Sequence, residues 1–144
     1  AVAHYTRAIE MDPAFLDAYH SRGLARAQAG DPAGAIEDFT KAIELSPSLQ
    51  KAYRNRGLAL MQTGRLDEAL ADFTKAIELN PQTPTAYRDR GDASRRKGDV
   101  EDALADYTTA VTLDPYFDEA YARRGALRLS AFSTSAVGTL DASG

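Results

Sequence analysis

The chain of 144 residues contains no cysteine and no long apolar run. Without cysteine it has no disulfides and no thiolate chemistry, which is compatible with a reducing compartment, and we therefore favour the cytoplasm as its location. Because every apolar stretch is short and interrupted, we expect no membrane-spanning segment, and no basic leader with an apolar core opens the sequence. The net charge of −4 gives no reason to expect indiscriminate nucleic-acid binding.

Residue types that carry out catalysis or bind metals are also scarce. The only histidines are His4 and His20, and the sequence has no glycine-rich phosphate loop and no histidine pair at metal-ligand spacing. Two roles are open to His20, a hydrogen bond in a binding groove or simple exposure to solvent. The sequence therefore predicts a protein that is not an enzyme and that needs no cofactor and no metal.

What the sequence does contain is a unit that repeats every 34 residues. One proline, one tyrosine and one glycine recur at that spacing four times each: Pro13, Pro47, Pro81 and Pro115; Tyr19, Tyr53, Tyr87 and Tyr121; Gly23, Gly57, Gly91 and Gly125. A fixed period of this length is the signature of a solenoid built from short supersecondary units.

Each unit is expected to hold two helices. Small and apolar residues at three- and four-residue spacing predict a first helix over residues 16–29 and a second over 32–45. Gly30 and Asp31 end the first helix and cap the second, and Pro32 suits a first helical position. Gly23 lies inside a helix, where glycine costs about 1 kcal/mol against alanine, so we expect a close helix-to-helix approach there.

These columns resemble the signature of the tetratricopeptide repeat, a helix-turn-helix unit. The residues that carry the resemblance are Tyr19, Gly23, Gly30, Ala35, Phe39, Ala42 and Pro47, with their equivalents 34 and 68 positions on. The resemblance covers residues 1–131 and implies an all-α fold, a right-handed superhelical solenoid of about seven helices. The chain departs from the family pattern in two columns, with Arg22, Arg56, Arg90 and Arg124 in one and Arg26, Leu60, Ser94 and Arg128 in the other.

The repeat predicts where each unit begins and ends. A half repeat over 1–15 precedes whole repeats over 16–49, 50–83 and 84–117, and a half repeat over 118–131 follows them. The simplest account is a piece of a longer array. The two half repeats are complementary, so they could also join one molecule to another. Residues 132–144 abandon the repeat and are expected to be a frayed tail or a segment that occupies a groove.

The arginine column has a candidate partner in Asp38, Asp72 and Asp106, which recur at the same period. Arg56 could pair with Asp72 of its own unit or with Asp38 of the preceding one, and a solvated charge on each helix face is the third interpretation. A partly buried pair would add little net stability, yet losing one member would strand a charge. We expect such a column to set the register of the helices.

The resemblance also implies a binding surface, because the family lines its concave face with first helices. The residues predicted to line this binding groove are His20, Leu24, Lys51, Arg54, Asn55, Leu58, Met61, Arg88, Asp92, Arg95 and Arg96. Arginine binds carboxylates through two parallel hydrogen bonds, so this partly basic surface suits an extended or helical peptide, possibly an acidic one. Ordinary solvated arginine is the alternative.

The expected partner is therefore a protein or peptide, with a homo-oligomer through the half repeats as the alternative. The basic cluster at residues 95–97 lies at an expected helix end and lacks interleaved aromatic residues, so nucleic acid is not expected, and neither is a membrane. Chaperone-binding members of the family grip a C-terminal carboxylate at positions that fall here on His20, Leu24, Asn55, Thr85 and Asp89. Only Asn55 matches, so capture of that kind is not expected.

Overall fold

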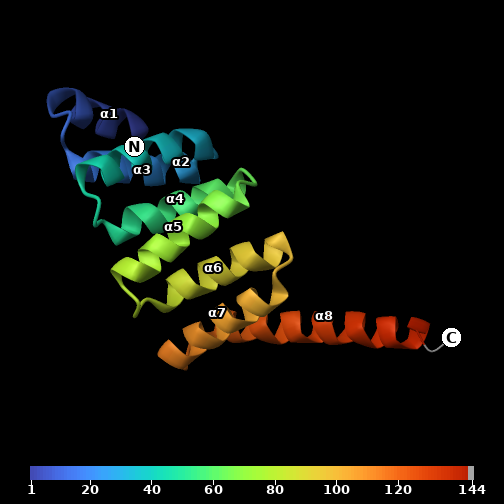
Figure 1. The fold of residues 1–144 in the computed structure, drawn as a ribbon. Coiled ribbons are helices and arrows are strands. Elements are labelled where there is room, and N and C mark those ends of the chain that lie inside the picture. The colour runs from blue at the N-terminus through green and yellow to red at the C-terminus, as the bar shows by residue number, and fades with distance from the viewer. Residues whose placement is uncertain (143–144) are drawn as a thin grey trace. The chain divides into compact units, whose positions relative to one another are not determined.

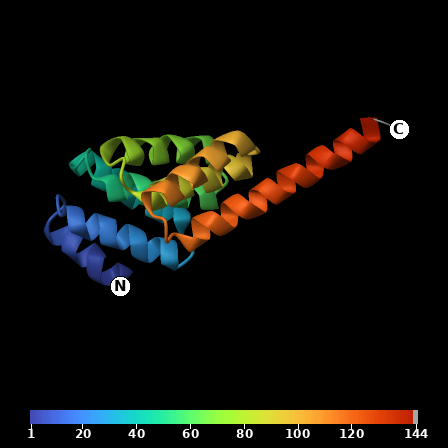
Figure 2. The same ribbon diagram turned by 90° about the horizontal axis from the view of Figure 1, so that it is seen from below.

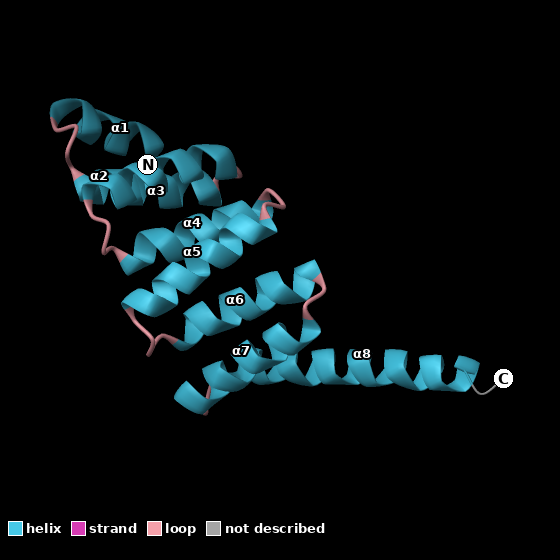
Figure 3. Ribbon diagram, viewed as in Figure 1, coloured by secondary structure: helices cyan, strands magenta, loops and turns pink. Residues whose placement is uncertain are grey.

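The computed structural model describes the backbone of residues 1–142 and the side chains of residues 1–132. These residues form eight α-helices joined by short turns (Figure 1, Figure 3). The prediction of an all-α fold is confirmed. The expected number of about seven helices is corrected to eight, because each terminal half repeat contributes one complete helix beside the three pairs.

The chain divides into two compact units, residues 1–81 and the residues from 82 onward. The first unit holds α1 (Val2–Met11), α2 (Leu16–Gln28), α3 (Pro32–Leu45), α4 (Gln50–Gln62) and α5 (Leu66–Leu79). The second holds α6 (Pro84–Lys97), α7 (Val100–Leu113) and α8 (Asp118–Ala142). Within each unit every helix packs on the next, and α2 also contacts α4. We call α2, α4, α6 and α8 the first helices, and α1, α3, α5 and α7 the second helices.

The helix boundaries follow from the turn residues. The side chain of Asp31 accepts a hydrogen bond of 2.9 Å from the backbone N–H of Gly34, and Pro32 begins α3. Gly30, Gly64 and Gly98 have positive φ angles of 84°, 77° and 96°, a conformation that other residues rarely adopt. The helices predicted over 16–29 and 32–45 are confirmed to within one residue as α2 and α3.

An aromatic ring of the second helix fills a notch at the glycine of the first helix in each complete pair. A Cβ atom on Gly23 would lie 2.6 Å from the ring of Phe39, and one on Gly57 would lie 2.7 Å from the ring of Phe73. The equivalent distance from Gly91 to the ring of Tyr107 is 2.7 Å. All three rings are fully buried. The close helix approach expected at this glycine column is therefore confirmed.

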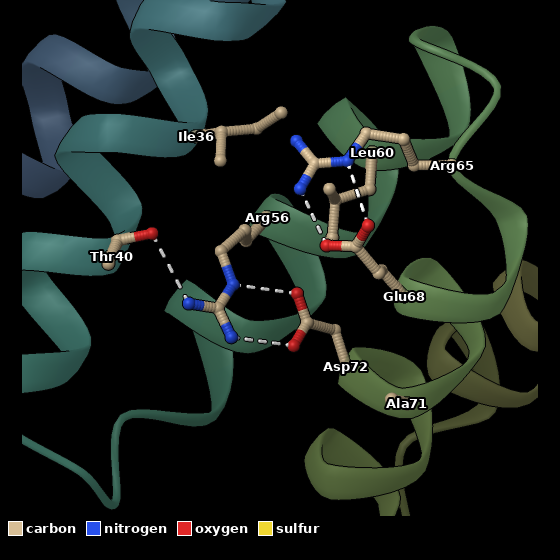
Figure 4. A pocket seen from close by; sticks show the side chains of 8 residues that line it. All are labelled: Ile36, Thr40, Arg56, Leu60, Arg65, Glu68, Ala71 and Asp72. Atoms are coloured by element: carbon tan, nitrogen blue, oxygen red, sulfur yellow. Dashed lines mark hydrogen bonds and ion pairs between the residues drawn. The ribbon is translucent and has the colours of Figure 1, made fainter.

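Beside each notch, an arginine and an aspartate pair through two hydrogen bonds within the same repeat. The three pairs are Arg22 with Asp38 (2.9 and 2.7 Å), Arg56 with Asp72 (2.7 and 2.8 Å; Figure 4) and Arg90 with Asp106 (2.8 and 2.8 Å). All three aspartates are buried. Of the alternatives left open by the sequence, the pair within one unit is the one that the structure contains.

Arginines of this column also contact the preceding second helix. Three hydrogen bonds to threonine are seen: Arg22 to Thr6 (3.2 Å), Arg56 to Thr40 (3.3 Å) and Arg124 to Thr108 (3.4 Å). Each guanidinium of the column also lies over the ring of the tyrosine three residues earlier, at 5.3–5.9 Å. The hydrogen bond to aspartate raises the pKa of Arg22, Arg56 and Arg90, so these arginines stay charged.

Helix α8 differs from the other first helices in length. It continues to Ala142, beyond residue 131 where the half repeat was expected to end, and it extends past the end of α7 (Figure 2). The backbone of the expected tail is thus helical up to Ala142, and its role as a groove occupant stays a prediction. Residues 143–144 of that tail lie outside the described residues.

The glycine notch can be tested with two matched substitutions. We expect Gly57→Ala to lower the free energy of unfolding by about 1–3 kcal/mol, because the added Cβ overlaps the Phe73 ring. Gly125 has nothing within 4 Å of the added Cβ, so Gly125→Ala should be neutral or stabilise by up to about 1 kcal/mol. Urea unfolding measures both. Equal effects of the two substitutions would contradict the notch.

The arginine–aspartate pair can be tested with a double-mutant cycle. Asp72→Ala should lower the free energy of unfolding by roughly 2–3 kcal/mol. This is less than the loss expected for a fully buried pair, because the Arg56 side chain is 22% exposed. We expect a coupling energy of about 1–2 kcal/mol between Arg56 and Asp72. The cycle between Arg56 and Asp38 is the control and should give less than about 0.5 kcal/mol. Coupling of the same size in both cycles would refute the pairing within one repeat.

Candidate functional site

In the first unit, a pocket of about 250 Å³ lies between the first helices α2 and α4. Phe39 of α3 contributes the ring that also fills the glycine notch. The remaining lining residues are Leu24, Ala27 and Gln28 of α2, and Asn55, Leu58, Ala59 and Gln62 of α4. No charged residue is among those that line this pocket in the described structure. The pocket therefore combines an apolar floor with three side-chain amides.

Two predicted groove residues from different repeats meet beside this pocket. Asn55 Nδ2 donates a hydrogen bond of 3.0 Å to His20 Nε2, which leaves the ring of His20 neutral, with its proton on Nδ1. Burial lowers the pKa of His20, the positive charge of Lys51 lowers it further, and Asp17 opposes both effects. The imidazole also lies 5.7 Å from the ring of Phe39. Of the two roles left open for His20, the structure thus contains a groove hydrogen bond.

The other groove residues predicted on α4 lie away from this pocket. Lys51 is exposed in the first turn of α4, and neither it nor Arg54 nor Met61 lines the pocket. Of the predicted residues in the first unit, the pocket contains Leu24, Asn55 and Leu58. A role in binding stays a prediction for these three residues and for His20, Lys51, Arg54 and Met61.

In the second unit, a pocket of about 390 Å³ lies between the first helices α6 and α8. Its lining consists of Arg95 from α6 and Arg123, Ala126, Leu127 and Ser130 from α8. Each of these residues stands 68 positions after a residue that lines the pocket of the first unit. The two pockets are therefore repeat equivalents. They differ in chemistry, because Arg95 replaces Ala27 and Arg123 replaces Asn55.

Arg88, which was predicted to contact a ligand, is already occupied by acidic groups of its own unit. Its guanidinium forms ion pairs with Asp89, at 3.1 Å, and with Glu119 of α8, and it lies 5.3 Å from the ring of Phe117. Its side chain is only 15% exposed. Arg88 thus joins α6 to the start of α8, and a role in ligand binding stays a prediction.

Asp92, another predicted groove residue, is also engaged within the second unit. It accepts a hydrogen bond of 2.6 Å from the hydroxyl of Tyr107 and pairs with Arg123 Nε at 3.1 Å. Burial and this hydrogen bond raise the pKa of Tyr107. Of the predicted arginines, Arg95 lines the pocket, whereas Arg96 is exposed beside it.

Sequence reasoning missed Arg123, which turns the second pocket basic. The signal was available, since Arg123 stands 68 residues after Asn55 and 34 after Asp89 in one groove column. Arg123 lies in the half repeat over 118–131, outside the three whole repeats whose columns supply the predicted groove residues. Sequence reasoning also missed the threonine column at Thr6, Thr40 and Thr108.

A third cavity, of about 300 Å³, lies where α3, α4 and α5 meet (Figure 4). Its charged groups are paired with one another, Arg56 with Asp72, and Arg65 with Glu68 at 2.6 Å. Because each charge is neutralised by its neighbour, this cavity has no charge available for a ligand. It is part of the contact between the repeats.

Two further observations bear on other classes of site. The described residues contain no group of three or more side chains placed to hold a metal ion. Across the same part of the chain, none of the helices combines the length and the apolar character that crossing a bilayer requires.

Two family models match the chain. One, described as a tetratricopeptide repeat, matches residues 54–116, and another, described as a TPR repeat, matches residues 23–64. The chain belongs to the tetratricopeptide repeat (TPR) family. The resemblance stated from the sequence is thereby confirmed, and TPR domains act as protein–protein interaction modules. No curated protein sequence matches the chain.

Several solved structures share the fold. A crystal structure of MamA has a TM-score of 0.86 at 24% identity, over 90% of this chain and 76% of that one. The TPR domain of OM64 from Arabidopsis has a TM-score of 0.77 at 26% identity, over 80% and 95%. The first TPR domain of Spaghetti (RPAP3), bound to the HSP90 peptide SRMEEVD, has a TM-score of 0.78 at 24% identity, over 81% and 92%.

The hydrogen bond between His20 and Asn55 predicts a pH dependence of stability. Because the folded state lowers the pKa of His20 from 6.5, the unfolded state takes up a proton first as the pH falls. The free energy of unfolding should therefore decrease between about pH 7.5 and about pH 5.5, and decrease less in His20→Gln. Urea unfolding across this range measures the difference. Identical slopes for the two proteins would rule out the proposed protonation state.

Proposed function

We propose that this TPR chain is a non-enzymatic interaction domain that binds a peptide segment of a partner protein on its first helices. One observation carries the proposal: the two units contain repeat-equivalent pockets between successive first helices, one neutral and one lined by arginine. The two pockets select for different side chains. We therefore propose that the first unit binds an apolar side chain and that the second unit binds an acidic one.

The pocket of the first unit suits an apolar side chain. Leu24 and Leu58 form its floor beside the Phe39 ring, and burying a Leu-sized side chain there would contribute roughly 1.5–3 kcal/mol. The amides of Gln28, Asn55 and Gln62 can donate to and accept from the backbone of an extended peptide.

The pocket of the second unit suits a carboxylate. Arg95 is exposed and Arg123 keeps 35% of its side-chain exposure, so both guanidinium groups remain accessible beside the apolar side chain of Leu127. Asp92 and Glu119 both pair with Arg123, at 3.1 and 3.3 Å, so the positive charge that is left for a ligand comes mainly from Arg95. The remaining positive charge attracts an acidic side chain and can bind it through charge-assisted hydrogen bonds.

The solved RPAP3 domain supports a peptide ligand for this fold, since its partner is the acidic peptide SRMEEVD. In the present chain, the residues at the carboxylate-gripping positions of the chaperone-binding members retain only Asn55. We therefore propose an acidic side chain within a segment as the ligand, in place of a free C-terminal carboxylate.

The alternative is self-association through the terminal half repeats. It is favoured by α1, which has no buried residues, and by Gly125 of α8, whose notch is open. It is opposed by His4, which stands in the column where the other second helices carry Asp38, Asp72 and Asp106. A strict monomer in light scattering over a range of concentrations would exclude this alternative.

Selection of a random peptide library on the chain tests the proposed function. We expect enriched peptides with acidic residues and enriched peptides with apolar residues. Arg95→Glu should weaken the binding of the acidic peptides at least about tenfold, or about 1.4 kcal/mol. Leu58→Asp should weaken the binding of the apolar peptides through the first pocket.

The control for this experiment is the double variant Lys41→Glu, Lys75→Glu, which reverses two half-exposed lysines on second helices. Its affinity for the selected peptides should match that of the wild type. Peptides that bind all variants equally would show that the two pockets are not the binding site.

A further inference from the structure

Helix α8 presents an exposed apolar stripe that no described residue covers. Leu129 and Phe132 are 71% and 73% exposed, and Tyr121 is also exposed. Together with Gly125 these residues are spaced by four, four and three positions, so they lie on one face of the helix. The face that packs in the second unit is a different one, because it carries the buried residues Ala120 and Leu127.

The other first helices show what covers such a face. Each carries an Arg–Gly dipeptide, and each receives an Asp–aromatic dipeptide from the following second helix. The three matched sets are Arg22–Gly23 with Asp38–Phe39, Arg56–Gly57 with Asp72–Phe73, and Arg90–Gly91 with Asp106–Tyr107. The glycine admits the ring, and the arginine binds the carboxylate beside it.

The fourth Arg–Gly dipeptide, Arg124–Gly125, has neither partner among the described residues. A Cβ atom built on Gly125 meets nothing within 4 Å, so its notch is open. The guanidinium of Arg124 donates to Thr108 at 3.4 Å and lies 5.3 Å from the ring of Tyr121, and no carboxylate of the described structure pairs with it. Among the described residues, no ring fills the notch at Gly125 and no carboxylate pairs with the guanidinium of Arg124.

We propose that this face of α8 is a second docking site, which binds an amphipathic helix of a partner protein that carries an Asp–Phe or Asp–Tyr dipeptide. The ring enters the notch at Gly125 and the carboxylate pairs with Arg124, as in the three internal sets. Apolar residues flanking the dipeptide cover Tyr121, Leu129 and Phe132. This site lies on a different face of α8 from the arginine-lined pocket, and it does not depend on the function proposed for that pocket.

None of the other helices in the described structure supplies this contact. The Asp–aromatic dipeptides of α3, α5 and α7 are buried in their own repeats. Helix α1 carries Tyr5 in the aromatic column but His4 in the aspartate column, so a second copy would present an imidazole to Arg124. A partner with the full dipeptide provides the carboxylate that α1 lacks.

The test uses the full chain and a capped peptide with the sequence of residues 66–79, which form α5 and contain Asp72–Phe73. Nuclear magnetic resonance titration should shift the backbone amides of Arg124 and Gly125. Gly125→Ala should weaken binding at least tenfold, because the added methyl group blocks the ring, while the open surroundings of Gly125 leave the fold intact. Arg124→Gln should weaken binding as well.

Matched controls keep the result specific. Peptides with Asp72→Ala or Phe73→Ala should each bind at least tenfold more weakly than the parent peptide. Ser130→Ala changes the pocket side of α8 and should leave the affinity for the peptide unchanged. Equal binding to the wild type and Gly125→Ala, or of the parent and Phe73→Ala peptides, overturns the proposal. Concentration-dependent dimers that both Tyr5→Ala and Gly125→Ala abolish would make a second copy the occupant and also overturn it.

Discussion

Each complete repeat depends on one contact, the Arg–Gly dipeptide of a first helix against the Asp–aromatic dipeptide of the second. A glycine inside a helix is unfavourable on its own, yet at Gly57 it leaves the space that the Phe73 ring fills. A buried carboxylate is also unfavourable on its own, and Arg56 compensates it with two hydrogen bonds. Because the two contacts are adjacent, a shift of either helix would break both, which is the physical reason to expect that together they set the helix register.

This contact leaves the groove side of the first helices free to differ between repeats. The same columns form a neutral pocket around Asn55 in the first unit and a basic one around Arg123 in the second. The residues that line these pockets are not the arginines and aspartates that pair within each repeat, such as Arg56 and Asp72. A substitution in a pocket therefore changes the surface at little cost to the fold. The family's role in protein interaction follows from this separation, with packing residues on one side and variable residues on the other.

Much of the fold could be predicted from the sequence, because the 34-residue period repeats every packing residue three or four times. The helix limits of α2 and α3, the glycine notches and the aspartates as partners of the arginines were all predictable in this way. Arg88 shows where such reasoning fails. Its column places Arg88 in the groove, but only the three-dimensional structure brings Phe117, at the end of its own repeat, and Glu119, from the following half repeat, into contact with it.

The sequence by itself determined the all-α class, the limits of α2 and α3 and the residue types available on each helix face. Local propensity and spacing suffice for these properties, since each depends on residues close together along the chain. Only the tertiary structure decided that Arg56 pairs with Asp72 and not Asp38, that His20 meets Asn55, and that the notch at Gly125 stays open. Contacts of this kind depend on the distance between helices. A periodic sequence offers each arginine more than one aspartate at the same spacing, and only the packing of the helices decides between them.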